Sequence, residues 1–260
     1  MRERYSVWSR GTAVTPHGTI LASDQLARMT SIKVMSYNIQ GHAAARRPDH
    51  LPKIAEVIAA VAPDVVGLQE VHHRTRAGSV HQSEALASMT GLQHVFGRST
   101  PMDGGDYGNA ILTRGEIKSS FTWPLPGSGE PRSVLQADID LQGRMFTFFV
   151  THLAAWGRLL RMARLRQIAE LGDITARGAH PHVLVGDFNV PPAAEEIRIL
   201  LSHGHLRVCG ESSEVTFPMT RQRLDYVFCD PRWEFLSADV IRRGPSDHWA
   251  IVVELNLRDA

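Results

Sequence analysis

From residue 32 onward, short apolar segments with the character of strands alternate with segments that have the apolar spacing of helices. Neighbouring strand segments occur both as hairpin-like pairs and on either side of a helix. We therefore predict an α/β protein with mixed rather than purely parallel β-sheets. Strands are predicted at residues 32–38, 64–70, 92–96, 108–113, 133–139, 145–151, 182–185, 224–229, 233–236 and 250–255, and helices at 51–61, 82–89, 157–171 and 195–201.

Residues 1–31 show no sustained periodicity, and we expect them to form a poorly structured N-terminal extension. Residues 32–260 follow without a linker and are expected to form a single domain, for which their length is ample. Met29 stands just before the first predicted strand. The extension is therefore either a genuine arm or the product of a start codon assigned too early.

The charge balance excludes a strongly basic protein that coats DNA, because 28 Lys and Arg residues face 27 Asp and Glu residues. Local basic patches remain possible, and most of their cations would be arginines.

The two cysteines, Cys209 and Cys229, are predicted to be thiols and not a disulfide framework. No apolar run approaches the ~20 residues that cross a bilayer, and residues 1–31 lack the apolar core of a secretion signal, so a cytoplasmic location is expected.

Polar side chains stand at the ends of apolar strands. In α/β sheets such positions line the ligand-binding crevice, and rigid strands hold the loops that carry them. One such residue is ordinarily a cap or a solvated turn, but five of similar character indicate a site. They are Asn38, Glu70, His152, Asp187 and Asn189.

Two further segments supply acid–base groups. Asp225 lies within an apolar strand, where a buried carboxylate is costly unless it is paired, and Asp247 and His248 precede the last strand. An aspartate bonded to His248 would fix the ring tautomer and raise its basicity. The alternative is that Asp225 caps a backbone turn.

The candidate metal ligands are oxygen donors, and neither a Cys₂His₂ nor an HExxH spacing is present, which disfavours zinc. Hard oxygens beside a phosphate substrate suit Mg²⁺, with Mn²⁺ as a plausible substitute. The candidate ligands are Glu70, Asp247, Asp187 and the amide of Asn38.

Seven short motifs that follow one another along the chain resemble those of the endonuclease/exonuclease/phosphatase superfamily. This superfamily includes DNase I, exonuclease III, inositol-phosphate 5-phosphatases and neutral sphingomyelinases. The resemblance covers residues 32–257. The motifs are residues 36–40 (SYNIQ), 67–71 (GLQEV), 107–112 (YGNAIL), 151–153 (THL), 186–189 (GDFN), 224–226 (LDY) and 246–248 (SDH).

The resemblance implies a four-layer sandwich in which two mixed β-sheets pack face to face, with helices outside and a metal site at one edge. It implies that Glu70 is the principal metal ligand, with Asn38 and Asp247 helping at the metal or through its waters.

It also assigns catalytic roles. Asp187 would orient or deprotonate the attacking water, and Asn189 would hydrogen-bond a phosphate oxygen. His248, oriented by Asp225, would contact the scissile phosphate and take part in proton transfer or charge stabilisation. His152 would stabilise the phosphate or protonate the leaving oxygen.

The sequence constrains the identity of the substrate less than it constrains the catalytic roles. The abasic-site branch carries Tyr-x-Pro-Asn where this chain has residues 151–153, which disfavours abasic-site repair. Asn109 and Arg132 are candidate substrate-binding residues, although Arg132 could equally be an exposed structural arginine. Three arginines spaced every third residue at 158, 161 and 164 could guide a polyanionic strand or an anionic lipid surface; the alternative is a solvated helix face.

The sequence therefore predicts a Mg²⁺-dependent phosphoester hydrolase, most plausibly a phosphodiesterase, in which water attacks phosphorus in line. Nucleic acid is the favoured substrate, because residues 102–105 form a polar segment and not an apolar membrane anchor. A phospholipid or inositol-phosphate hydrolase is the alternative. A catalytically silent binding module is a third reading, disfavoured because Glu70, Asp187 and His248 are all present. No protein partner is predicted.

Overall fold

The computed structural model describes residues 12–14, 20–22, 31–76, 78–155, 157–211 and 213–258. The chain divides into two units, residues 1–31 and residues 32–260. In the first, β1 (Thr12–Val14) and β2 (Ile20–Ala22) pair antiparallel. The rest of the expected extension, up to residue 30, lies outside the described residues, so its lack of structure stays a prediction.

The first sheet of the second unit has the order β14-β15-β3-β4-β7-β6, with β5 paired to β4. Strand β3 runs parallel to β4 and is connected to it through a 3₁₀ turn, η1, and helix α2, whereas β7 is antiparallel to β4. The bounds are β3 (Ser31–Asn38), η1 (Gly41–Ala45), α2 (His50–Val61), β4 (Val65–Thr75), β5 (Gly78–His81), β6 (Gln93–Met102), β7 (Gly105–Thr113), β14 (Trp233–Ile241) and β15 (Ala250–Leu257).

The second sheet has the order β12-β13-β11-β10-β9-β8. Its only parallel pair among the described strands is β10 with β11, connected through helix α4. Both sheets are thus mixed, as predicted. The bounds are β8 (Glu116–Leu125), β9 (Arg132–Leu141), β10 (Arg144–His152), α4 (Arg158–Ala176), β11 (His182–Asp187), β12 (Arg207–Cys209) and β13 (Asp225–Cys229).

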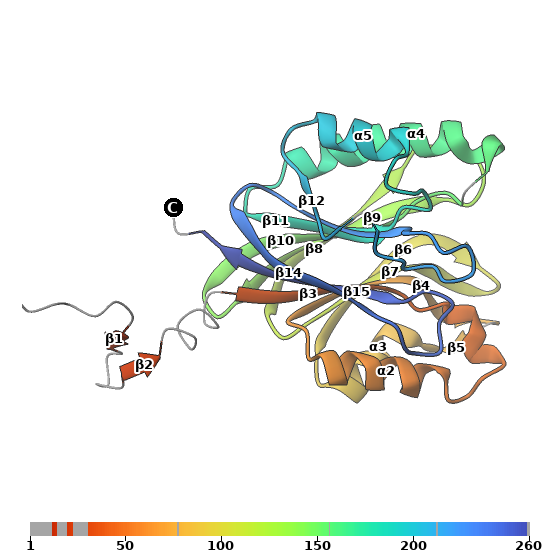
Figure 1. The fold of residues 1–260 in the computed structure, drawn as a ribbon. Helices are drawn as coiled ribbons and strands as arrows, with labels where there is room; N and C mark the ends of the chain where they lie inside the picture. Colours follow the sequence, from red (N-terminus) through yellow and green to blue (C-terminus); the bar gives the residue numbers. More distant parts are fainter. Residues whose placement is uncertain are drawn as a thin grey trace, which may run out of the picture. The chain divides into compact units, whose positions relative to one another are not determined.

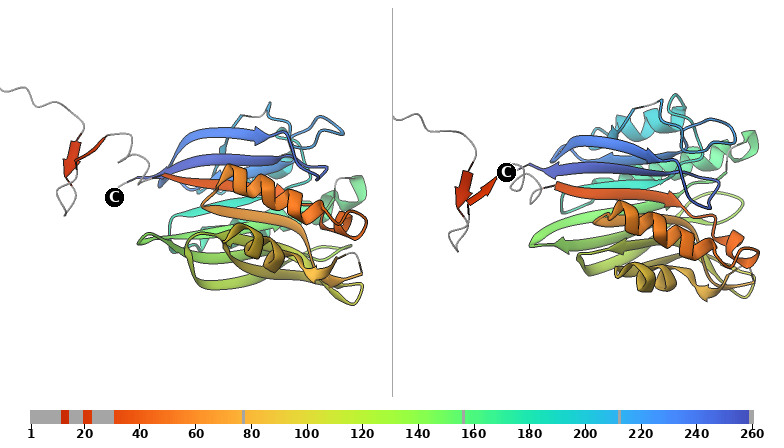
Figure 2. Two further views of the ribbon diagram at one scale, coloured as in Figure 1. Left: turned by 90° about the horizontal axis from the view of Figure 1, so that it is seen from below. Right: turned by 60° about the horizontal axis from the view of Figure 1, so that its bottom comes forward.

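Helices cover the outer face of each sheet (Figures 1 and 2). Helices α2 and α3 (Gln82–Thr90) lie against the first sheet, and α4 and α5 (Glu195–Ser202) lie against the second. This arrangement confirms the predicted four-layer sandwich. Among the described residues, no helix is long and apolar enough to cross a membrane.

The central strands are buried on both faces, and their alternate residues enter different apolar clusters. In β4, Val65 packs between the two sheets, whereas Val66 packs beneath α2 and α3. In β10, Phe148 packs between the sheets and Phe149 beneath α4 and α5. Successive residues of a strand point to opposite faces, and both faces are buried here. These strands are therefore nearly continuous apolar runs in the sequence.

Three described strands of the second unit were not predicted. The longest is β8, whose outward side chains are largely exposed; Phe121, for example, is 54% exposed. It also contains Pro124, which an edge strand tolerates because one side of its backbone has no partner strand. β12 is a short strand at the sheet edge beside β13, and β5 is a short strand that pairs with the last residues of β4. None of them shows the apolar pattern of the central strands.

The two cysteines lie in the core between the sheets, and they are free thiols as predicted. Their sulfur atoms are 3.3 Å apart.

The two sheets pack closely against each other at Gly67. A Cβ atom on Gly67 would lie 2.3 Å from Cγ2 of Val185 and 2.8 Å from Cγ2 of Val150. Both valines belong to the opposite sheet and are fully buried. Any side chain at residue 67 would therefore push the sheets apart.

We expect Gly67→Ala to lower the free energy of unfolding by about 1–3 kcal/mol, the cost of overpacking a filled core. Ser120→Ala, at an exposed position of β8, should change it by less than about 0.5 kcal/mol. Urea unfolding of both variants measures the difference. Equal stability of the two would show that the sheets are not in close contact at Gly67.

Candidate active site

The polar residues predicted from the strand ends lie together at one edge of the sandwich. In the first sheet, the residue paired with Asn38 directly precedes Glu70. In the second, His152 pairs with Asp187. The side chain of Asn38 reaches Asp187 across the gap between the sheets, 149 positions away in the chain.

Asn38 links the two carboxylates. Its Nδ2 donates to Oε1 of Glu70 at 3.0 Å and to Oδ2 of Asp187 at 3.1 Å, while its Oδ1 accepts from the backbone N–H of Gln40 at 3.0 Å. A carboxylate only accepts hydrogen bonds, so the nitrogen must face both acids. Here Asn38 positions the carboxylates, and its predicted role at a metal or its waters stays a prediction.

Glu70 occupies an unusual backbone position. The register of β4 against β7 shifts between Leu68 and Val71, and Glu70 lies in this bulge with a φ of 58°. Gly41 packs against it so closely that a Cβ would lie 2.2 Å from the Glu70 carbonyl oxygen. A left-handed conformation is costly for glutamate, and such strain persists where the surrounding structure enforces it. The bulge directs the carboxylate into a cavity.

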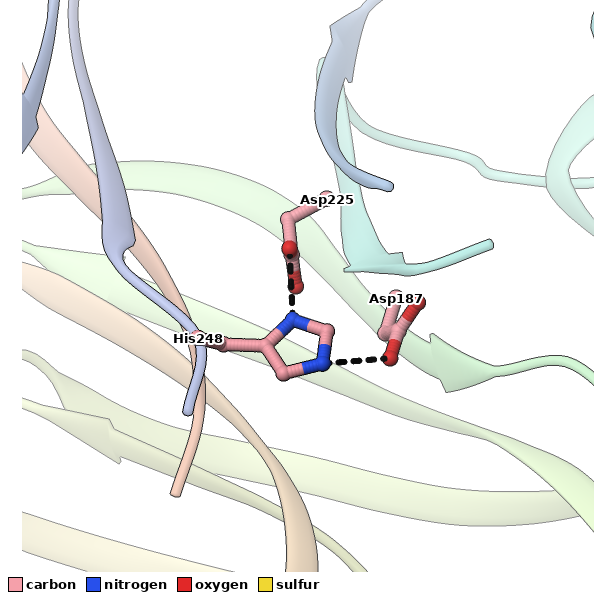
Figure 3. Close-up of side chains that lie close together, drawn as sticks. All are labelled: Asp187, Asp225 and His248. Atoms are coloured by element: carbon pink, nitrogen blue, oxygen red, sulfur yellow. Dashed lines mark hydrogen bonds and ion pairs between the residues drawn. The ribbon is translucent and has the colours of Figure 1, made fainter. Parts of the chain in front are cut away.

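Asp225 and His248 form a buried pair (Figure 3). Nδ1 of His248 is 2.8 Å from Oδ2 of Asp225, and Nε2 is 3.7 Å from Oδ2 of Asp187. Because a carboxylate accepts, Nδ1 carries the hydrogen. Burial lowers the pKa of His248, but the two aspartates outweigh it and raise the pKa to about 10. His248 is thus an imidazolium at neutral pH.

Burial shifts the pKa values of Asp187 and His152 in opposite directions. Oδ1 of Asp187 accepts from the backbone N–H of Asn189 at 2.9 Å, and Oδ2 is 3.6 Å from Nε2 of His152. Burial raises the pKa of Asp187, an effect that the charge of His248 partly offsets. Burial lowers the pKa of His152 well below its ordinary value, so its ring is neutral. Nδ2 of Asn189 lies 3.1 Å from Nε2 of that ring.

These groups open into a cavity of about 420 Å³. It is lined by His42, Glu70, His72, Met102, Tyr107, Glu130, Arg132, His152, Ala155, Asp187, Asn189, Phe217, Asp247 and His248.

The cavity offers a hard cation a suitable donor set. Burial alone would raise the pKa of Glu70, but the nearby His42, the hydrogen bond from Asn38 and the charge of His248 bring it down to about 2, so Glu70 is ionised. Asp247 lines the same cavity. Carboxylate oxygens at an open, polar site suit a divalent cation that keeps some of its waters.

The tightest acidic and imidazole cluster among the described residues is a different one, Asp187, Asp225 and His248. It is a poor metal site, because Asp225 already occupies Nδ1 of His248 and the ring is positively charged.

The two candidate substrate-binding residues lie in different environments. Arg132 lines the cavity and is 8% exposed, so it is not the exposed structural arginine of the alternative reading. Its Nη2 lies 3.1 Å from Oε1 of Glu130, while Nε and Nη1 have no partner among the described residues. Asn109 does not line the cavity: it is 1% exposed, and its Nδ2 donates to the carbonyl of Ser133. The structure therefore gives Asn109 a place in sheet packing.

Two of the three arginines that could form a cationic flank on α4 are paired with acids. Nε of Arg164 is 3.2 Å from Oε1 of Glu196, and both side chains are buried. Arg161 is paired with Glu195. Both arginines thus have acidic partners on α5, and the side chain of Arg158 lies outside the described part of the chain.

Sequence reasoning missed several cavity residues. Tyr107 stands in a recognised motif without a role assigned to it, and its ring packs edge-on against His72. His42 lies 3.7 Å from the Glu70 carboxylate, and the Phe217 ring is 4.7 Å from that of His248. His42 and Phe217 come from turns, where no periodicity could have pointed to them.

A four-layer sandwich with acidic and imidazole groups at one edge is the architecture of hydrolases that act on phosphoester bonds. The sequence profile of the Endonuclease/Exonuclease/phosphatase family matches residues 35–248, and the chain belongs to this family.

Three individual proteins show the range of the similarity. YbhP of Escherichia coli strain K12, described as uncharacterized, is 29% identical over 171 residues, which cover 61% of this chain and 67% of YbhP. An inositol phosphosphingolipids phospholipase C of Schizosaccharomyces pombe is 24% identical over 194 residues, 66% of this chain and 44% of that protein. The crystal structure of an endonuclease/exonuclease/phosphatase from Beutenbergia cavernae superposes with a TM-score of 0.73 at 26% identity, covering 88% of this chain and 72% of that one.

The strain at Glu70 gives a stability prediction. Glu70→Gly should be about 1 kcal/mol more stable to urea than Glu70→Ala, because only glycine adopts a φ of 58° without penalty. At Glu234, which is exposed and has no positive φ, the order should reverse, with Gly less stable than Ala by about 0.5–1 kcal/mol. The same order at both positions would contradict the strained backbone.

The raised pKa of His248 gives a pH prediction. Protonation of His248 stabilises the folded state fully below pH 6.5, the ordinary histidine pKa, and the stabilisation is lost as the pH rises toward about 10. The excess stability of the wild type over His248→Gln should therefore shrink from pH 6.5 to pH 10, measured by urea unfolding with EDTA present. A difference independent of pH over that range would rule out the charged Asp225–His248 pair.

Proposed function

We propose that the protein is a Mg²⁺-dependent phosphodiesterase of the cytoplasm, with Mn²⁺ as a substitute metal and nucleic acid as its favoured substrate. The observation that carries this proposal is the arrangement around Asp187. A buried carboxylate lies between a neutral imidazole, His152, and a positively charged one, His248, beside the ionised Glu70. Phosphoester hydrolysis by water needs a proton acceptor, positive charge around the phosphate and a proton donor for the leaving oxygen.

Glu70 and Asp247 would hold the cation, with Asn38 fixing the position of Glu70. When bound, a divalent cation supplies Lewis-acid stabilisation of the charge on the phosphate.

Asp187 is suited to accept the proton of the attacking water. Asn38 and the backbone N–H of Asn189 fix its two oxygens, so the carboxylate cannot rotate away. Its raised pKa makes it a stronger base than an ordinary aspartate. Asn189 donates from Nδ2 to the carbonyl oxygen of Leu153 and contacts Nε2 of His152, so its amide would have to exchange one of these contacts for a phosphate oxygen.

His248 supplies fixed positive charge. With Nδ1 held by Asp225, its Nε2–H points toward Asp187 (Figure 3), and both His248 and Asp187 line the cavity. A donor held in this way stabilises charge that develops on a phosphate oxygen without having to reorient. His152, whose Nε2 lies 3.6 Å from the same Asp187 oxygen, would assist at the phosphate or the leaving oxygen.

Arg132 supports the assignment of an anionic substrate. A buried guanidinium whose Nε and Nη1 lack partners among the described residues needs an acceptor, and a phosphate offers two oxygens to its planar fork. The rings of Tyr107 and Phe217 line the same cavity, which gives contacts for an organic group on the phosphate. These features support a substituted phosphate over inorganic phosphate.

A lipid phosphodiester is the second candidate. Met219, 77% exposed, lies two residues from Phe217 at the cavity wall, and the Schizosaccharomyces pombe relative is named as a phospholipase C. Nucleic acid stays favoured because the hairpin on the other side of the cavity, residues 102–105, is polar apart from Met102.

We expect the purified protein with Mg²⁺ or Mn²⁺ to hydrolyse bis-p-nitrophenyl phosphate and to nick plasmid DNA, and EDTA to abolish both activities. Glu70→Gln and His248→Gln should each lower the turnover about 10²–10⁴-fold while the protein stays folded. Glu116→Gln, at an exposed position of β8, is the matched control and should retain wild-type rates.

Near wild-type turnover in Glu70→Gln or His248→Gln would refute the site assignment. Hydrolysis of a phospholipid or an inositol phosphate with plasmid DNA left intact would favour the second candidate. Metal binding without hydrolysis of any of these substrates would indicate a silent binding module.

A further inference from the structure

Five exposed cations from two distant parts of the chain gather beside the active-site cavity. Two come from the turn between η1 and α2, one from the first turns of α2, and two from the connection between β14 and β15. They are Arg46, Arg47, Lys53, Arg242 and Arg243.

The two segments enclose a hollow of about 520 Å³, which we call the basic hollow. Nη1 of Arg47 donates to the carbonyl oxygen of Pro245 at 3.3 Å and so joins the two sides. The hollow is lined by Arg47, Asp49, Lys53, Glu56, Val57, Arg243, Gly244 and Pro245.

The charge of this region is not neutralised internally. Lys53 pairs with Asp49 at 2.5 Å, and Glu56 is the other acid of the lining. The side chains of Arg46, Arg242 and Arg243 make no hydrogen bond or ion pair with the described residues. On α4, by contrast, Arg161 and Arg164 are both paired with glutamates. The unpaired arginines of this side of the molecule are therefore available to an anionic ligand.

Both chain segments that carry the basic hollow also contribute to the lining of the active-site cavity. His42 lines the cavity, and Arg46 and Arg47 follow it in the chain. Asp247 lines the cavity from the other side, a few residues after Arg243. The hydroxyl of Ser246 donates to the carbonyl of Asn38 at 2.7 Å, which fixes this second segment to the end of β3.

We propose that the basic hollow binds the backbone phosphates of a nucleic-acid strand whose scissile phosphate lies in the active-site cavity. This inference rests on the proposed function. Arginine favours phosphate because its fork meets two oxygens at once. Since no aromatic side chain lines the hollow, it would contact the sugar–phosphate backbone without reading or stacking bases.

The composition of the hollow favours a nucleic acid over a membrane surface. Binding to a membrane interface combines basic residues with exposed apolar ones. The large apolar side chains that are exposed in the described part of the chain lie outside the two segments: Val80, Met89, Phe121, Met162, Val208, Met219, Phe235 and Leu236.

The test is the double variant Arg242→Gln/Arg243→Gln, whose residues are outside the catalytic machinery. Its matched control is Arg114→Gln/Arg177→Gln, which removes the same charge from exposed arginines that follow β7 and α4. Binding of a single-stranded oligodeoxynucleotide is measured by fluorescence anisotropy with EDTA, at several salt concentrations. Hydrolysis of the same oligonucleotide and of bis-p-nitrophenyl phosphate is measured with Mg²⁺.

We expect the double variant to bind the oligonucleotide about 10-fold more weakly. A plot of the logarithm of the association constant against the logarithm of the salt concentration should become shallower by about 0.7 for each phosphate that is no longer neutralised. Its kcat/KM should fall about 10-fold on the oligonucleotide, through KM, and stay unchanged on the small diester, which is too short to reach the hollow. The control should behave as the wild type on both substrates.

Unchanged oligonucleotide binding in the double variant would overturn the inference even if the enzyme hydrolyses the small diester. Weaker binding to vesicles of anionic phospholipid, with oligonucleotide binding intact, would overturn it in favour of a membrane surface. Weakened oligonucleotide binding in a protein that hydrolyses neither substrate would support the basic hollow and refute the proposed function instead.

Discussion

The amide of Asn38, placed between the carboxylates of Glu70 and Asp187, is the contact on which the site depends. It joins the edges of two sheets and holds two negative charges within reach of one nitrogen. Two carboxylates so near each other repel unless donors and positive charge lie among them. The buried His248, held by Asp225, supplies that charge beside the same Asp187 oxygen that Asn38 contacts.

The rest of the fold serves to hold these groups at short range. Gly67 allows the two sheets to pack closely, and the Val and Phe side chains of β4, β10 and β11 fill the space between them. The sheet edges therefore meet instead of leaving an open gap. One local feature opposes stability, the left-handed backbone at Glu70. It lies where the chemistry is proposed, which is where a folded protein tolerates local conflict.

Much of the fold and of the site could be predicted from the sequence, because central strands and site residues obey simple patterns. Strands β3, β4, β10 and β11 must be apolar on both faces, and their polar residues are therefore conspicuous at the ends. Edge strand β8 has no such requirement and was missed. Side-chain partners could not be predicted either. Arg164 reads like any surface cation until Glu196 is seen beside it, and Asn109 reads like a ligand-binding amide until its bond to Ser133 is seen.

The position of β15 has a consequence for the synthesis of the protein. This strand, the last of the domain, lies next to β3, the strand that opens it, and residues 246–248 just before β15 complete the cavity. A growing chain thus carries Asn38, Glu70 and Asp187 long before it has His248 or a closed first sheet. Strand β3 must wait with an unpaired edge until β15 has been made, a period in which it is exposed to wrong pairing. In return, a chain that stops before residue 246 lacks Asp247 and His248, so the cavity cannot be completed until nearly the whole domain has been made.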